Sequence, residues 1–358
     1  MKTMTSLQRV ATVLDGRVPD RVPVGLHNFL MASRATGADL GDVLRDGEAL
    51  AEAQLAAWRE FRHDVIMHEN GVHAEAEALG CGVLYQPGIA PHVEHPVVES
   101  IEDIDKLRVP DPEKAFPLNE VLEATRILAR EIGGKVFING RADQGPIALA
   151  LALCGPERFL LWAAQPELRP HVLRLLQITS RMNIVYGESQ IRAGAHGSCI
   201  GLAGTSLISP AMFDALELPF ARAFGAAIRR AGGISFMHAC GNETRLLEHL
   251  IQTGADCLEL DPGTNAGVCK AATRGRTAVL GMLEPVHVLR NGTVDEVRQR
   301  ATEILQIMAP QGGFIMGPGC ALPPDTPSEN IHEVMACARA AGRYASDGSL
   351  RGDGTPGA

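Results

Sequence analysis

The stretch FARAFGAAIRRAGGISFMHAC, residues 220–240, contains one complete unit of the pattern that decides the fold. Its first part carries apolar residues at helical spacing and ends in two glycines, as helices commonly do. Its second part, residues 234–239, is a short apolar run with the length of a buried strand. Helix and buried strand alternating along a chain are typical of an α/β fold built on a parallel sheet.

The same alternation extends in both directions from this stretch. Short apolar or β-branched runs recur, separated by longer segments of helical period. Eight such strands are the number that closes a (β/α)8 barrel, the TIM barrel, and this α/β fold is our prediction. The predicted strands are residues 22–27, 64–69, 136–141, 198–203, 234–239, 257–261, 277–283 and 313–319.

Two segments depart from the alternation of strands and helices. Residues 73–110 predict a hairpin or small excursion, followed by the acidic helix SIEDIDKL, which would form a flap between the second and third strands. Residues 346–358 are rich in Gly, Ser and Asp and are predicted to be disordered, because they carry too little apolar surface to offset ordering. The remaining chain, residues 1–345, is expected to form a single barrel domain.

The composition restricts the class of partner. The chain of 358 residues is 46% hydrophobic and has a net charge of −9, which disfavours nucleic acid or an anionic membrane as a partner and favours a small molecule or another protein. No apolar run approaches the roughly 18 to 20 residues that span a bilayer. The first residues carry charges where a signal peptide needs an apolar segment, and the eight cysteines lack the dense spacing of a disulfide scaffold. We therefore expect a cytoplasmic protein with free thiols.

Polar residues cluster where the predicted strands end. In (β/α)8 barrels the chemistry takes place at the carboxyl ends of the strands, so these residues are the candidates for a site. They are His27, Asn28, His68, Glu69, Asn70, Asn139, Arg141, Asp143, Gln144, His238, Cys240, Asp261, Glu284 and Cys320.

Three of these residues have the chemistry of metal ligands. Residues i and i+2 of an extended segment point to the same side, so His238 and Cys240 can reach one ion together. Cys320 follows the Gly-Pro-Gly turn after the eighth strand and can add a second thiolate. One imidazole and two thiolates with a vacant fourth position describe a catalytic zinc site.

The residues alone leave other interpretations open. Cysteine is among the most buried residue types, so His238 and Cys240 can also be core side chains at the end of a strand. Asp143 and Glu284 each precede a predicted helix or turn and can serve as caps. The spacing does not decide between these alternatives.

Several motifs together resemble the uroporphyrinogen decarboxylase superfamily, and within it the branch of zinc-dependent cobalamin methyltransferases. The matching stretches include RVATVLDGRVPDRVPV, ESIEDIDKLRVPDPEK, HACGN, GMLEP and GPGCALPPDTPSENI, and the resemblance runs from about residue 5 to 344. The family pattern of His-x-Cys followed much later by Cys falls on His238, Cys240 and Cys320. The resemblance thus implies a (β/α)8 barrel with Zn²⁺ on these three residues.

The resemblance also implies an activity, a cofactor and a partner. The activity is transfer of a methyl group between a small substrate, either a thiol or a methoxy or other methylated donor, and the cobalt of a corrinoid. Zinc would activate a thiol, as in relatives that methylate coenzyme M, or act as a Lewis acid on a methyl donor. Because the Asp-x-His-x-x-Gly motif of a fused corrinoid domain is missing, the cobalamin is expected on a separate protein. A homodimer is left open, and no nucleic acid or membrane partner is expected.

We assign expected roles to the remaining candidates on the same basis. Glu284 and Asp261 are the expected catalytic groups, as the fourth ligand or as neighbours of the metal. The expected substrate pocket is formed by His27, His68, Asn139, Arg141, Asp143 and Gln144.

The chain departs from its relatives at two positions. The decarboxylase carries an arginine-rich segment soon after the first strand, where this chain reads HNFLMASRATG and retains only Arg34. Relatives often carry an acid after the fourth strand, where this chain has Gly204 and Thr205. A metal-free lyase resembling the decarboxylase is the alternative function, and a barrel that binds a ligand without converting it is a third.

Overall fold

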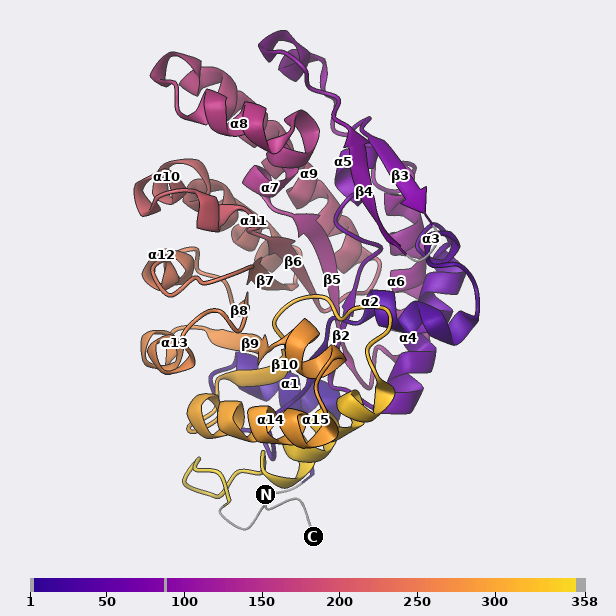
Figure 1. Cartoon of the computed structure of the whole chain (residues 1–358), viewed down its shortest axis with the longest axis vertical. Helices are drawn as coiled ribbons and strands as arrows, with labels where there is room; N and C mark the ends of the chain where they lie inside the picture. The colour runs from indigo at the N-terminus through magenta and orange to yellow at the C-terminus, as the bar shows by residue number, and fades with distance from the viewer. Residues whose placement is uncertain (1–2, 87–88, 352–358) are drawn as a thin grey trace.

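The closed parallel sheet is the centre of the molecule. The computed structural model describes residues 3–86 and 89–351, without the side chain of Asp143. Eight parallel strands form one sheet in the order β1-β2-β5-β6-β7-β8-β9-β10, and the parallel bridge between Val24 and Met316 joins its two ends (Figure 1). The strands are Gly25–Leu26 (β1), Val65–His68 (β2), Phe137–Gln144 (β5), Gly197–Gly201 (β6), Ile234–Ala239 (β7), Cys257–Leu260 (β8), Ala278–Leu283 (β9) and Phe314–Pro318 (β10). Each overlaps one of the eight predicted strands, so the predicted (β/α)8 barrel is confirmed.

Helices follow the strands and enclose the barrel, as Figure 1 shows. Side-chain caps mark several helix starts: Asp46 accepts the N–H of Ala49 at the start of α4, and Thr293 and Glu296 form a capping box at the start of α14. The α-helices are Ser6–Leu14 (α1), Phe29–Ala32 (α2), Leu40–Val43 (α3), Gly47–Phe61 (α4), Ala74–Ala78 (α5), Leu118–Ile132 (α6), Pro146–Cys154 (α7), Pro156–Ala163 (α8), Arg169–Arg192 (α9), Pro210–Leu216 (α10), Leu218–Arg230 (α11), Leu247–Gln252 (α12), Ala266–Thr273 (α13), Val294–Met308 (α14) and Ser328–Ala340 (α15). Shorter turns are Ser33–Thr36 (η1), Ile101–Lys106 (η2), Pro166–Leu168 (η3), Thr205–Leu207 (η4) and the π-helical Pro285–Arg290 (η5).

Two apolar clusters stabilise the barrel. The larger one lies between the strands and the surrounding helices. The smaller one fills the barrel interior, where Met67, Phe137, Phe236, Leu280 and Ile315 meet Val10 and Val13 of α1. Strands with apolar contacts on both faces have nearly continuous apolar sequences. This is why the strands could be predicted from the sequence.

The predicted excursion lies between β2 and β5. It contains α5, an antiparallel hairpin of Gly82–Gln86 (β3) and Ile89–His95 (β4), and η2. In Figure 1 the hairpin lies at the outer edge of the molecule, and β4 contacts α3. Its role as a flap stays a prediction.

The chain after α15 folds back on itself in the part that the structure describes. Tyr344 and Leu350 form an antiparallel bridge, and the N–H of Arg351 donates to the carbonyl of Arg343 at 2.9 Å. Residues 348–351, which belong to the tail predicted to be disordered, therefore have backbone partners. The rest of that tail, residues 352–358, lies outside the described residues.

No single helix among the described residues is long and apolar enough to cross a bilayer. Helices α7 and α8 reach such a length and composition only as a pair bent by 117°.

Candidate metal centre

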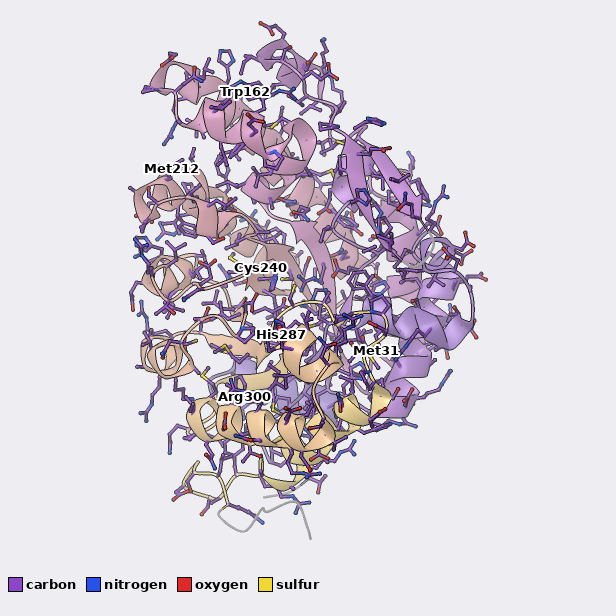
Figure 2. The ribbon with its side chains drawn as sticks, in the orientation of Figure 1. Met31, Trp162, Met212, Cys240, His287 and Arg300 are labelled. Atoms are coloured by element: carbon purple, nitrogen blue, oxygen red, sulfur yellow. The ribbon has the colours of Figure 1, made fainter. Side chains whose placement is uncertain are left out.

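The three predicted metal ligands meet at the carboxyl ends of β7 and β10. One donor atom each of His238, Cys240 and Cys320 lies within 4.8 Å of the other two, and this is the one group of its kind among the described residues. The Nε2 atom of His238 is 2.8 Å from the Sγ atom of Cys240. Figure 2 shows Cys240 near the middle of the molecule. One imidazole nitrogen and two sulfur atoms at this separation fit the donor set that zinc prefers.

Neighbouring loops fix the position of Cys240. The N–H of Gly241 donates to Asp261 Oδ2 at 3.0 Å, directly after Cys240 in the chain. Two residues further, the N–H of Glu243 donates to the hydroxyl of Thr264 at 3.1 Å. The loop after β7 is therefore tied to the loop after β8, and Cys240 is held between them.

A close backbone approach fixes the position of Cys320. A Cβ atom at Gly319 would lie 2.4 Å from Pro262 Cδ and 2.8 Å from the Cα of Asp261, so only glycine fits before Cys320. The N–H of Gly319 donates to the carbonyl of Leu283 at 2.8 Å. The end of β10 is thus pressed against the ends of β8 and β9.

A buried ionic layer lies beneath the three ligands, between them and the apolar interior. Glu259 of β8 accepts a hydrogen bond of 2.5 Å from Arg141 NH1. Its carboxylate is also 3.5 Å from the Nδ1 atoms of both His27 and His238. Glu69 contacts His27 Nε2 and lies 3.5 Å from Arg141 Nε. Since Glu259 faces the nitrogen of His238 that does not face the sulfur, it can orient this imidazole, as carboxylates beside metal-bound histidines do.

Burial and charge act against each other in this layer. Burial lowers the pKa of His27, as does Arg141, but Glu69 and Glu259 outweigh both and raise it to about 9. Burial raises the pKa of Glu259, yet Arg141 and His238 hold it well below its usual range. We conclude that Glu259 is a carboxylate and His27 a cation at neutral pH.

The two thiols of the cluster differ in their pKa. Hydrogen bonds from Cys240 and His238 outweigh burial and lower the pKa of Cys320. The negative charge that results, together with burial, raises the pKa of Cys240. The site thus favours a thiolate at Cys320, and a bound cation would favour a second one at Cys240.

The predicted pocket residues divide into two groups. His27 and Arg141 belong to the ionic layer. Asn139 is fully buried one inward position below Arg141, and its amide atoms have no hydrogen-bond partner among the described residues. Gln144 ends β5 half-buried, while the side chain of Asp143 lies outside the described part of the chain. A role for these residues in binding a substrate stays a prediction.

His68 has a different environment from the one predicted. Its Nε2 atom lies 3.4 Å from the carbonyl of Val121 in α6, outside the barrel. Because side chains alternate along a strand, Met67 and Glu69 face inward and His68 faces the helices. His68 therefore lies apart from the other predicted pocket residues, and burial lowers its pKa to about 4.

The two predicted catalytic acids have structural contacts. Asp261 holds the N–H of Gly241. Glu284 caps η5, where its carboxylate accepts the N–H groups of His287 and Val288. Capping, the alternative that the sequence left open for Glu284, is the contact that the structure contains.

Two acids near the centre were missed by sequence reasoning. Glu259 lies inside the apolar run CLELD, where a charge on the same face as Cys257 and Asp261 was the available signal. Glu243 follows Cys240 by three residues, is fully buried, and accepts a hydrogen bond of 3.3 Å from Thr205. Burial raises the pKa of Glu243 to about 7. The region after the fourth strand, which lacks its own acid, thus contacts one from the next loop.

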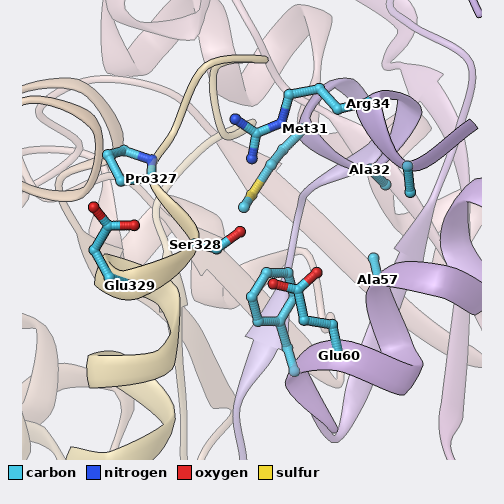
Figure 3. A pocket seen from close by; sticks show the side chains of 10 residues that line it. Met31, Ala32, Arg34, Ala57, Glu60, Pro327, Ser328 and Glu329 are labelled. Carbon is cyan, nitrogen blue, oxygen red and sulfur yellow. The ribbon is translucent and has the colours of Figure 1, made fainter. Parts of the chain in front are cut away.

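A separate cavity of about 520 Å³ lies between α2, η1, α4 and the start of α15. Figure 3 shows Met31 and Arg34 on one side of it and Glu329 on the other. None of the metal-centre residues lines it. The NH2 group of Arg34 donates to the carbonyl of Thr326 at 2.8 Å, so the one arginine retained in this segment binds the loop after β10.

The geometry defines the class: an α/β barrel with a buried ionic layer and a metal-competent His-Cys-Cys cluster at the carboxyl ends of its strands. The family model described as uroporphyrinogen decarboxylase (URO-D) matches residues 5–341. The chain belongs to the uroporphyrinogen decarboxylase family, as its sequence motifs predicted.

Individual relatives fall into two groups by name. A methylcobamide:CoM methyltransferase of Methanosarcina acetivorans is 27% identical over 95% of this chain and 99% of its own length. A uroporphyrinogen decarboxylase of Bordetella petrii is 26% identical over 86% of this chain and 88% of its own. A solved methyltransferase from Methanosarcina mazei has a TM-score of 0.85 and 23% identity, and covers 94% of this chain and 99% of that one. This last likeness supports the fold.

Proposed function

We propose that this chain is a zinc-dependent methyltransferase that moves a methyl group between a small thiol or methylated substrate and the cobalt of a corrinoid. The observation that carries the proposal is the cluster of three sulfur and nitrogen donors at the barrel mouth. Three protein donors leave one zinc position for a substrate, whereas a structural site would normally use four. The methyltransferase relatives that span nearly the whole chain favour the same activity.

The residues of the chain would divide the work at this site. His238, Cys240 and Cys320 would hold the zinc, which lowers the pKa of a coordinated thiol and so supplies a nucleophile at neutral pH. Glu259 would orient His238, and the loops joined through Asp261 and Thr264 would keep Cys240 in place. His238 is buried and Cys240 and Cys320 are half-buried, which would limit the access of bulk water to the reacting groups.

The corrinoid would arrive on a separate protein. The described residues form one barrel with a short hairpin excursion and contain no second domain for a corrinoid. Residues 73–110 would act as a flap beside the mouth, within a single barrel domain. We place the enzyme in the cytoplasm, where the eight cysteines would stay reduced.

The proposal is tested by metal content and methyl transfer together. We expect about one zinc per chain by elemental analysis, and transfer from free methylcobalamin to a small thiol, followed by the cobalamin spectrum. Cys240→Ala and Cys320→Ala should each lower zinc affinity by about 10²- to 10³-fold, since one of roughly four ligands is lost, and abolish transfer at limiting zinc. Cys269→Ala, which removes a buried thiol of α13, is the matched control and should retain both.

The decarboxylase alternative makes the opposite prediction. A metal-free lyase would keep full activity in both cysteine variants and would decarboxylate uroporphyrinogen. We expect no such reaction, because Arg34 is the one arginine in this segment and binds a loop carbonyl. Uroporphyrinogen turnover by zinc-free protein would overturn the proposal.

A further inference from the structure

A small cavity lined by arginines lies at the end of the barrel away from the metal centre. It has a volume of about 270 Å³ and is formed where the first and last described segments meet. An antiparallel bridge between Arg21 and Arg343 joins those segments beside it. In Figure 1 the indigo and yellow ends of the ribbon come together at this lower end. The charged residues that line the cavity are Arg9, Asp20, Arg21, Arg339, Arg343 and Arg351.

Two of the arginines belong to a buried ion-pair network that forms the floor. Arg9 NH1 lies 2.7 Å from Asp64, and its Nε lies 2.7 Å from Asp20. Arg21 NH1 lies 2.8 Å from the other oxygen of Asp64, whose side chain is fully buried. Two aspartates thus neutralise two arginines, and these four side chains need no further partner.

The other three arginines have no carboxylate partner among the described residues. Their side chains donate to backbone carbonyls: Arg339 to Phe61 at 3.4 Å, Arg343 to Arg339 at 2.8 Å and Arg351 to Tyr344 at 3.1 Å. Arg343 and Arg351 use only Nε for these bonds, so their NH1 and NH2 groups stay available. A guanidinium offers five N–H donors in a planar fork, which suits oxyanions.

The local charge is opposite to that of the chain. Five arginines against Asp20 and Asp64 leave three positive charges around this cavity, in a chain whose net charge is −9. Like charges gathered around one hollow repel one another, and an anion between them would remove this repulsion. The three arginines without a carboxylate partner belong to the last described segment, and the paired arginines of the first segment form the floor, so a bound anion would lie between the two segments.

We propose that this cavity is a binding site for a small phosphate-bearing anion. Arginine binds phosphate oxygens through paired hydrogen bonds, and three guanidinium groups match a doubly or triply charged ligand. A volume of about 270 Å³ corresponds to roughly nine water volumes, which is room for a diphosphate group. The site does not depend on the methyl-transfer proposal, because no residue of the metal centre lines it.

The test is titration of the full-length protein with inorganic phosphate and pyrophosphate at constant ionic strength. We expect saturable binding by calorimetry and a matching rise in the midpoint of thermal unfolding, with pyrophosphate bound more tightly than phosphate. The double variant Arg343→Gln, Arg351→Gln should bind pyrophosphate at least 10-fold more weakly. Both arginines are exposed, so the variant should fold normally.

Three controls give the outcome its meaning. Arg300→Gln removes an exposed arginine of α14 that pairs with Glu303, and should leave binding unchanged. Phosphate also stabilises proteins in general through exclusion from their surface, so an equal rise in the melting midpoint of the double variant would overturn the proposal. Asp353→Asn should leave the affinity unchanged; tighter binding would mean that this carboxylate of the chain itself competes for the cavity, and would overturn the assignment to an external anion.

Discussion

The lower and upper parts of the barrel interior are built from the same strands and have opposite chemistry. On β2, β5, β7 and β8 the lower inward positions carry Met67, Phe137, Phe236 and Cys257. The positions above them carry polar or charged side chains, namely Glu69, Asn139, Arg141, His238 and Glu259. Successive inward positions are two residues apart on a strand, so the interior changes from apolar to ionic over this short distance.

The difference separates stability from function. The lower layer removes apolar surface from water, which stabilises the fold. The upper layer buries charges whose desolvation opposes folding, and a buried ion pair is weak support for stability. What the ionic layer contributes is a fixed orientation for His238, directly below the metal ligands.

The largest effect is expected when the ionic layer loses its central carboxylate. Glu259→Ala leaves Arg141 and His27 buried beside one carboxylate, Glu69, and should lower the free energy of unfolding by about 3–5 kcal/mol. It should also weaken zinc binding by about 10- to 100-fold, because His238 loses its oriented partner. Urea denaturation and zinc titration measure the two effects. Glu259→Gln keeps the shape of the side chain but removes its charge. If it weakens zinc binding as much as Glu259→Ala does, the charge of the carboxylate is the cause.

The complementary change is made in the lower layer. Leu280→Ala removes a buried side chain that packs against Gly25 and Ile315, and should lower the free energy of unfolding by about 2–4 kcal/mol. Zinc stoichiometry and affinity of the folded variant should stay unchanged. A drop in zinc affinity as large as that of Glu259→Ala would show that the two layers do not act separately.

Much of this division could be predicted from the sequence, for physical reasons. Strands buried on both faces give continuous apolar runs, so all eight were found. That His238 and Cys240 point to the same side follows from strand alternation. The glycine before Cys320 indicated a close backbone approach, which the structure contains at Gly319.

The ionic layer could not be predicted in the same way. Glu259 sits within an apolar run, and its partners lie on strands far away in the chain. Which face of β2 points inward depends on how the barrel closes, so the sequence could not show that His68 faces α6 and Glu69 the interior. A carboxylate before a turn, such as Glu284, has the same sequence signal whether it caps or binds a ligand.

A buried carboxylate outside the barrel sharpens the contrast with Glu259. Glu217 accepts the N–H of Ile147 at 3.1 Å, no cation faces it among the described residues, and burial raises its pKa to about 8. Between the unfolded pKa of 4.5 and this value, the folded state holds a proton that the unfolded state has lost. The free energy of unfolding should therefore fall by about 2–3 kcal/mol as the pH rises from about 6 to 8.

Glu217→Gln should remove that part of the pH dependence, because an amide cannot ionise. Urea denaturation at several pH values compares the two slopes. Equal slopes in the wild type and the variant would mean that the buried carboxylate does not titrate in this range.

The smallest effect concerns the backbone contact that positions Cys320. Gly319→Ala places a Cβ atom against Pro262 and the backbone of Asp261, so the end of β10 must move away from β8. We expect a loss of about 1–2 kcal/mol in the free energy of unfolding. Zinc affinity should fall by about 10-fold, since Cys320 follows directly and moves with it.

Gly134→Ala, where a Cβ meets nothing within 4 Å, is the matched control. If Gly319→Ala lost stability but kept its zinc affinity, Cys320 would have freedom to follow the metal, and the ionic layer alone would determine the geometry of the centre.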